Sequence, residues 1–147
     1  MPIADDSIKI ETILHAPIER VWKAWTDPIT ILTWFGSDPN GTGVRAEMDV
    51  RRGGAYEITF RNSDYAEHTC FGTYTEVRPF SKLCLTWTWK NEPNVESLVT
   101  IELTSENHHT RMRFEHAHVG TESAHNYLQG WQSTFAKLER ALAQNTV

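Results

Sequence analysis

The chain has little basic charge, few cysteines and no long hydrophobic run. Its 147 residues carry 14 Lys and Arg against 19 Asp and Glu, which gives a formal net charge of −5. Binding to nucleic acid or to an anionic membrane surface would need a basic footprint, so neither partner is predicted. No stretch of about eighteen apolar residues is present, and the N-terminus lacks a basic and then apolar signal-peptide pattern. We therefore expect a cytoplasmic protein without membrane insertion.

The two cysteines lie on either side of a predicted turn near Pro79. If the flanking strands pair as a hairpin, Cys84 lies opposite a residue near Thr75. Cys70 is then about five residues further along its strand, roughly 16 Å away at the usual rise per residue. This separation exceeds the reach of a disulfide. We expect two free thiols with no metal-binding or redox role.

Few side chains are arranged for catalysis or cofactor binding. His68 could do general acid–base work with Glu76 or Asp64 if both partners faced a cavity, but a hydrogen-bonded core histidine is the more common arrangement. The segment at residues 51–54 (RRGG) is predicted to form a hairpin turn with a solvated tip and not a phosphate-binding loop. No catalytic residue and no cofactor are predicted.

A metal site would need three histidines, His116, His118 and His125, to converge with a carboxylate such as Glu115. The first two lie where a strand is predicted to end, and no second pair of ligands supports them. No metal is therefore predicted.

Aromatic residues are plentiful, with six Trp, six Phe and four Tyr. Excess aromatic side chains usually belong to the core, but they also line concave apolar sites. A chain of this length can bury one sizeable core, and it contains no repeats, linkers or low-complexity tracts. The natural interpretation is a single domain over residues 1–147.

The longest helical pattern runs from Ser123 to Gln144, after Gly120 has ended the preceding strand. Thr121 or Ser123 can cap this helix. Apolar residues at steps of mostly three and four define one face: Tyr127, Leu128, Trp131, Phe135, Leu138 and Leu142. The other face is predicted to be solvated and carries Gln132, Lys137, Glu139, Arg140 and Gln144.

Most of the preceding sequence alternates between apolar and polar residues, which predicts strands. Two short helices interrupt the series after the first strand: one begins at Pro17, and the other is capped by Asp27, begins at Pro28 and ends near residues 34–36. The predicted strands cover residues 7–14, 44–50, 56–61, 66–77, 82–89, 96–105 and 110–117. Short turns between successive strands indicate an antiparallel meander. The predicted fold class is therefore α+β, with seven strands, two short helices and one long helix.

Four sequence blocks together resemble one family. They are PIERVWKAWTDPITILTWFG (17–36), DVRRGGAYEITF (49–60), GTYTEVRPFSKLCLTWTW (72–89) and LQGW (128–131). The chain is similar to the SRPBCC superfamily, which has the helix-grip fold of the birch pollen allergen and the START lipid-transfer domains. Within it, the chain resembles the branch named for homology to the activator of the heat shock protein ninety ATPase. The resemblance implies a seven-stranded curved sheet that grips the C-terminal helix around an internal cavity. Relatives often have histidine three residues before the helical glycine, where this chain has Tyr127.

The alternation predicts which side chains face the long helix. In the strand from 66 to 77, a four-residue turn would point His68, Gly72, Tyr74 and Glu76 inward, and a bulge would reverse that. Gly130 lies in the middle of the best helix. Either a sheet edge approaches it closely, or its missing side chain leaves room at a cavity mouth, or it is an exposed glycine that the helix merely tolerates. The candidate ligand-binding residues are Trp34, Tyr56, Ile58, Phe60, Tyr74, Trp87, Met112, Phe114, His116, Tyr127, Gly130 and Trp131. The alternative is that these residues form a filled core.

Three classes of function remain open. The leading hypothesis is a protein that encloses a small hydrophobic or amphiphilic molecule between sheet and helix. The second is a cofactor that contacts a chaperone and stimulates its ATPase, as the resemblance implies. The third is a cyclase- or hydrolase-type enzyme of the wider superfamily, which would require polar residues that converge inside the cavity.

Overall fold

Seven antiparallel strands form one curved sheet in the order β1-β7-β6-β5-β4-β3-β2. The structure, a computed structural model, describes residues 7–119 and 121–144, without the side chains of 121–126 and 144. The strands are β1 (Ile8–Leu14), β2 (Thr42–Met48), β3 (Ala55–Arg61), β4 (Glu67–Arg78), β5 (Lys82–Trp89), β6 (Ser97–Glu106) and β7 (His109–Ala117). The predicted meander is confirmed, and β1 completes the sheet by pairing with β7.

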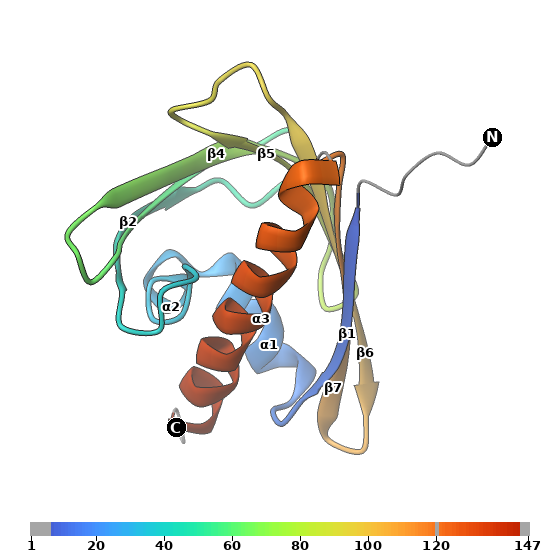
Figure 1. The fold of residues 1–147 in the computed structure, drawn as a ribbon. Coiled ribbons are helices and arrows are strands. Elements are labelled where there is room, and N and C mark those ends of the chain that lie inside the picture. Colours follow the sequence, from blue (N-terminus) through green and yellow to red (C-terminus); the bar gives the residue numbers. More distant parts are fainter. Residues whose placement is uncertain (1–6, 120, 145–147) are drawn as a thin grey trace.

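Three helices lie on the concave side of this sheet. The long helix α3 (Thr121–Gln144) crosses the concave face, and α1 (Ile18–Thr26) and α2 (Pro28–Ile31) lie beside the C-terminal half of α3 (Figure 1). The α+β helix-grip architecture is thereby confirmed. The helix α3 begins two residues before the predicted start, and its predicted capping side chains lie outside the described residues. None of the described helices has the length and apolar character that a membrane span requires.

The two short helices differ slightly from their predicted bounds. Pro17 is the N-cap of α1 and not its first residue. Asp27 caps α2 as predicted, because its carboxylate accepts hydrogen bonds from both the backbone N–H (2.8 Å) and the hydroxyl (2.7 Å) of Thr30. The helix α2 ends at Ile31, short of the predicted end. The backbone continues into a tighter 3₁₀-type turn, in which the Thr33 N–H donates to the carbonyl of Thr30, three residues earlier.

A β-bulge decides which face of β4 points inward. The pairing of β4 with β5 shifts between Tyr74 and Glu76, so the two residues lie on opposite faces. Tyr74 is 2% exposed and faces the helix. Of the two orientations that the sequence left open for Glu76, the outward one with a bulge is found, because this carboxylate lies on the outer face and pairs with Arg78 and Lys82.

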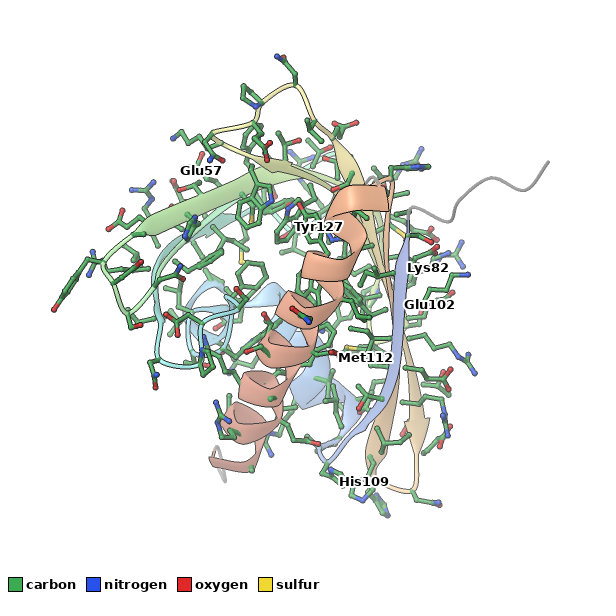
Figure 2. The ribbon with its side chains drawn as sticks, in the orientation of Figure 1. Glu57, Lys82, Glu102, His109, Met112 and Tyr127 are labelled. Carbon is green, nitrogen blue, oxygen red and sulfur yellow. The ribbon has the colours of Figure 1, made fainter. Side chains whose placement is uncertain are left out.

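Side chains of successive strand residues point alternately to the solvent-exposed outer face of the sheet and to the inner face, which packs against α3. Figure 2 shows Lys82 and Glu102 on the side of the sheet turned away from α3, whereas Met112 is fully buried between sheet and helix. Both cysteines are buried and free, as predicted. The pairing also fits the predicted separation of the two thiols. Cys84 lies opposite Glu76, next to the expected Thr75, and Cys70 lies further along its strand, opposite Trp89.

Lys137 does not belong to the solvated face of α3, although the sequence places it there. Its side chain is buried at 8% exposure. The ammonium donates hydrogen bonds to the backbone carbonyls of Gly36 (3.2 Å) and Asp38 (2.9 Å). The long aliphatic stem is covered by the loop that follows α2, and this contact joins the loop to the helix.

Candidate functional site

A small aromatic pocket opens where α3, the loop after α2 and strands β3 and β5 meet. Its volume is about 80 Å³. Its wall combines aromatic rings with the backbone and small side chains of the loop and helix: Phe35, Gly36, Ser37, Phe60, Trp87, Trp89, Tyr127, Gly130, Trp131 and Thr134. The enclosed space is smaller than the roughly 300–1,000 Å³ of sites that surround a drug-sized ligand. It has the size to enclose one part of a ligand and not the whole of it.

The periods of strand and helix place these residues on one wall. Trp87 and Trp89 lie two residues apart on β5 and therefore point to the same side of the sheet. On α3, Tyr127, Gly130 and Trp131 follow the spacing of three and four residues that keeps side chains on one helical face. The indole rings of Trp87 and Trp131 lie 5.3 Å apart, so strand and helix contact each other through these rings.

The polar groups of the pocket are mostly hydrogen-bond donors. The indole N–H of Trp89 donates to the Tyr127 hydroxyl at 2.7 Å. The indole N–H of Trp87 is buried and has no hydrogen-bond partner among the described residues. Burial raises the pKa of Tyr127, although the indole N–H groups of Trp89 and Trp87 partly oppose this shift. The phenol therefore stays protonated at neutral pH, and its own hydrogen has no acceptor among the described residues.

The loop at the pocket rim is held in place from both sides. Gly36 has a φ of +112°, and a Cβ at this position would lie 2.9 Å from the Phe60 ring, so the turn requires glycine. The hydroxyl of Ser133 on α3 donates to the Ser37 carbonyl at 2.7 Å. Together with the bonds from Lys137, this contact fixes the rim to the helix.

Gly130 lies at the pocket mouth opposite this rim. A Cβ built on Gly130 would lie 3.5 Å from the Cβ of Ser37, which is an ordinary van der Waals contact. Its near neighbour is thus the loop and not an edge of the sheet. Of the alternatives that the sequence left open, close approach by a sheet edge is wrong.

His116 is fixed in one neutral form by a chain of hydrogen bonds. The indole N–H of Trp131 donates to Nδ1 of His116 at 3.0 Å. Nδ1 therefore carries no proton, and the proton on Nε2 is directed to the Ser97 hydroxyl at 2.7 Å. Ser97 in turn donates to the Trp87 carbonyl at 3.3 Å. Burial lowers the pKa of His116 from 6.5 to about 3.

Both ring nitrogens of His116 are thus occupied, so this residue braces β7, β6 and α3 against one another and is closed to a metal ion. His118 is exposed and His125 lies outside the described side chains. Within the described part of the chain, no three metal-ligating side chains converge.

The twelve predicted site residues divide into three groups. Five of them line the pocket: Phe60, Trp87, Tyr127, Gly130 and Trp131. A narrow internal cavity of about 20 Å³ is lined by Trp87 and Trp131 again, together with Tyr56, Ile58 and Tyr74. The remaining four are buried but line neither space: Trp34, Met112, Phe114 and His116. For these four, the filled-core alternative describes the packing.

Other pocket residues were absent from the predicted set. Thr134 follows Gly130 by one helical turn, so helical spacing points to it. Trp89 shares the strand face of Trp87. Phe35 and Gly36 lie at the predicted end of the second short helix, and Ser37 begins the predicted loop. In the structure α2 already ends at Ile31, and no periodic signal places these three residues beside α3.

The predicted acid–base partners of His68 do not meet it. Glu76 is on the outer face, and the Asp64 carboxylate accepts a bond from the Ala66 N–H in the turn after β3. His68 instead lies near the rings of Phe60 (5.6 Å) and Trp89 (6.3 Å) and contacts the Asn62 amide. It is a packed histidine at the edge of the aromatic cluster.

A curved antiparallel sheet wrapped around a C-terminal helix is the architecture of the helix-grip class of proteins. In this chain an aromatic pocket lies where sheet and helix meet. Residues 15–143 match the family of the Activator of Hsp90 ATPase homolog 1-like protein, and the chain belongs to this family. No curated protein matches it.

Several solved structures share the fold. A protein from Nitrosomonas europaea is 24% identical with a TM-score of 0.82, and 97% of each chain is covered. The AHSA1-like protein from Aeromonas hydrophila is 22% identical with a TM-score of 0.79, over 93% of this chain and 92% of the other. CalU16 from Micromonospora echinospora is 25% identical with a TM-score of 0.71, over 94% of this chain and 76% of the other.

Proposed function

We propose that this protein binds a small hydrophobic or amphiphilic molecule whose planar aromatic part enters the pocket beside Tyr127. The observation that carries the proposal is the Trp87 indole N–H, a buried donor that makes no fully formed hydrogen bond in an apolar setting. The Trp87 N–H makes no hydrogen bond of ordinary geometry among the described residues, although it acts on the half-buried Tyr127 hydroxyl, and that hydroxyl has no acceptor for its own hydrogen among the same residues. A buried donor without a partner costs about 1–3 kcal/mol, which a ligand acceptor would recover.

The chemistry of the pocket selects the ligand class. Flat rings are favoured because Phe60, Trp87 and Trp131 offer both faces and edges for aromatic contacts. The donors call for a neutral acceptor such as a carbonyl or ether oxygen. None of the described side chains that line the pocket is acidic or basic, so a charged group would find no ionic partner among them. A planar aromatic ketone satisfies all of these conditions.

The test is a titration that compares flavone with 2-phenylnaphthalene, which has a similar shape but no oxygen. Tryptophan fluorescence, corrected for ligand absorption, reports binding. We expect saturable quenching by flavone at micromolar concentrations, on the order of −8 kcal/mol. 2-Phenylnaphthalene and Tyr127→Phe should each weaken binding by about tenfold, the effect of one lost hydrogen bond.

Gly130 supplies a matched pair of variants. Gly130→Leu should fill the mouth and abolish flavone binding, whereas Gly130→Ala adds only a methyl group at ordinary contact distance and should bind normally. Ala136→Leu, which adds a leucine at an exposed site of α3, controls for the added apolar surface. Normal flavone binding by Gly130→Leu, or no saturable change with the native protein, would contradict the proposal.

A further inference from the structure

A second depression lies between the short helices and the C-terminal half of α3. Its volume is about 510 Å³, within the range typical of small-molecule sites. We call it the basic groove, and it is lined by Arg20, Lys23, Ala24, Ile29, Thr30, Thr33, Trp34, Pro39, Gly41, Lys137, Leu138, Arg140, Ala141 and Leu142. It shares no lining residue with the aromatic pocket. The elements that form it lie side by side in the lower part of Figure 1.

Four cations converge on the basic groove, and none of its described lining residues carries a carboxylate. Arg20 and Lys23 are three residues apart on α1, and Lys137 and Arg140 are three apart on α3, so each pair lies on one helical face. This concentration of positive charge contrasts with the net charge of −5 of the chain. None of the four forms an ion pair with any carboxylate in the described part of the chain.

The nearby acidic side chains are engaged elsewhere. The Asp27 carboxylate accepts both bonds from Thr30 at the start of α2. The Asp38 carboxylate accepts from the backbone N–H and hydroxyl of Ser63 and from the backbone N–H of Asn40. Neither carboxylate forms a direct ion pair with a cation of the groove, although Asp27 interacts electrostatically with Lys23 and Asp38 with Lys137.

Several of the cationic donors remain available. Lys23 and Arg140 are exposed and make no hydrogen bond among the described residues. Arg20 donates through Nη2 to the Leu142 carbonyl, but its Nε is buried without a partner. Lys137 is the anchored member of the set, because two backbone carbonyls hold its ammonium.

The floor between these cations is apolar. Buried side chains lie beneath it (Ala24, Trp34, Leu138 and Leu142), and the apolar surface that a ligand can contact is presented by the more exposed Ile29, Pro39 and Ala141. At the rim, Ile29 is 77% exposed, an unusual position for a large aliphatic side chain unless it contacts something. An apolar floor beneath cationic side chains is complementary to a molecule with an apolar body and an anionic head.

We propose that the basic groove binds an amphiphilic organic anion. The apolar body lies along the floor between α1 and α3, and a carboxylate or phosphate head contacts the exposed side chains of Lys23 and Arg140. Binding at this site is separate from binding in the aromatic pocket.

The test uses dodecanoate and dodecyl phosphate below their micelle concentrations, with dodecanol as the neutral body and inorganic phosphate as the isolated head. Backbone amide NMR shifts give both the affinity and the location. We expect saturable shifts at Ala24, Thr30 and Leu142 with at least one of the two amphiphilic anions. Dodecanol and inorganic phosphate should each bind at least about tenfold more weakly. The tighter of the two anions identifies the head group.

The double variant Lys23→Gln/Arg140→Gln removes the two exposed cations, which have no structural bonds to lose. Its affinity for the preferred anion should fall by about tenfold or more. The control Arg51→Gln/Arg52→Gln removes the same charge at the hairpin turn between β2 and β3 and should bind like the native protein.

Three outcomes would overturn the proposal. They are equal affinity for dodecanol and the anions, unchanged affinity in the Lys23→Gln/Arg140→Gln variant, and shifts confined to the amides around Tyr127 and Trp87. Binding of a poly-glutamate peptide at the groove amides, without binding of either dodecyl anion, would also overturn it and indicate a protein partner instead.

Discussion

The buried neutral state of His116 should make the stability of this protein fall in weak acid. In the folded state the pKa of His116 is about 3, against an ordinary value of 6.5. The imidazole has no exposed surface, and its hydrogen-bond partners within the described part of the chain are the Trp131 indole and the Ser97 hydroxyl. Below pH 6.5 the unfolded chain binds a proton that the folded chain cannot accept. The stabilising contribution is thus complete above pH 6.5 and is lost as the pH falls towards 3.

The magnitude follows from the width of this interval. Each unit of pH below 6.5 removes about 1.4 kcal/mol from the free energy of unfolding. Between pH 7.5 and pH 5 the loss attributable to His116 is therefore about 2 kcal/mol. This is a large part of the 5–15 kcal/mol that typically stabilises a small domain.

The assay is urea unfolding at several pH values, followed by tryptophan fluorescence, for the native protein and His116→Gln. Glutamine cannot titrate, and its amide offers both an acceptor and a donor to the former partners of the imidazole. At pH 7.5 the variant should be less stable by about 1–3 kcal/mol. At pH 5 that difference should have shrunk by about 2 kcal/mol. His109→Gln, at an exposed site, is the control and should follow the native curve. A difference between native protein and His116→Gln that stays constant with pH would refute the reasoning.

Two further predictions concern buried polar groups. Lys137→Met should lower the free energy of unfolding by about 1–3 kcal/mol, because the carbonyls of Gly36 and Asp38 lose their donor. The exposed control Arg140→Met should stay within about 0.5 kcal/mol of the native protein in the same urea titration, and equal effects of the two variants would show that the buried bonds contribute nothing. Cys70 is completely buried, and this burial raises the pKa of its thiol. In a Cys84→Ser chain, Ellman's reagent should therefore label Cys70 only when denaturant is added; rapid labelling of the folded chain would contradict the packing.

The sequence by itself determined the elements of this fold and their order. Alternation in the strands and the three-to-four spacing of the long helix are local consequences of backbone geometry, and both appear where they were predicted. Short turns between successive strands restrict their connections to a meander. Asp27 is identifiable as a cap because its side chain bonds to a backbone N–H only three residues away.

Tertiary structure decided the features that depend on contacts between distant segments. The bulge in β4 turns Glu76 outward, and one residue of register is enough to change the face of every later side chain. Lys137 is buried because a loop about one hundred residues earlier presents two carbonyls to it, so its helical position alone gave the wrong environment.

The two candidate sites illustrate the same division. Helical and strand periods identify Trp87, Tyr127 and Gly130 as members of one wall of the aromatic pocket. The loop that completes the mouth, and the pairing of cations from α1 and α3 across the basic groove, arise only when the helices pack together. Such juxtapositions carry no periodic signal, because the chain between the paired residues can vary without changing the pattern of either helix.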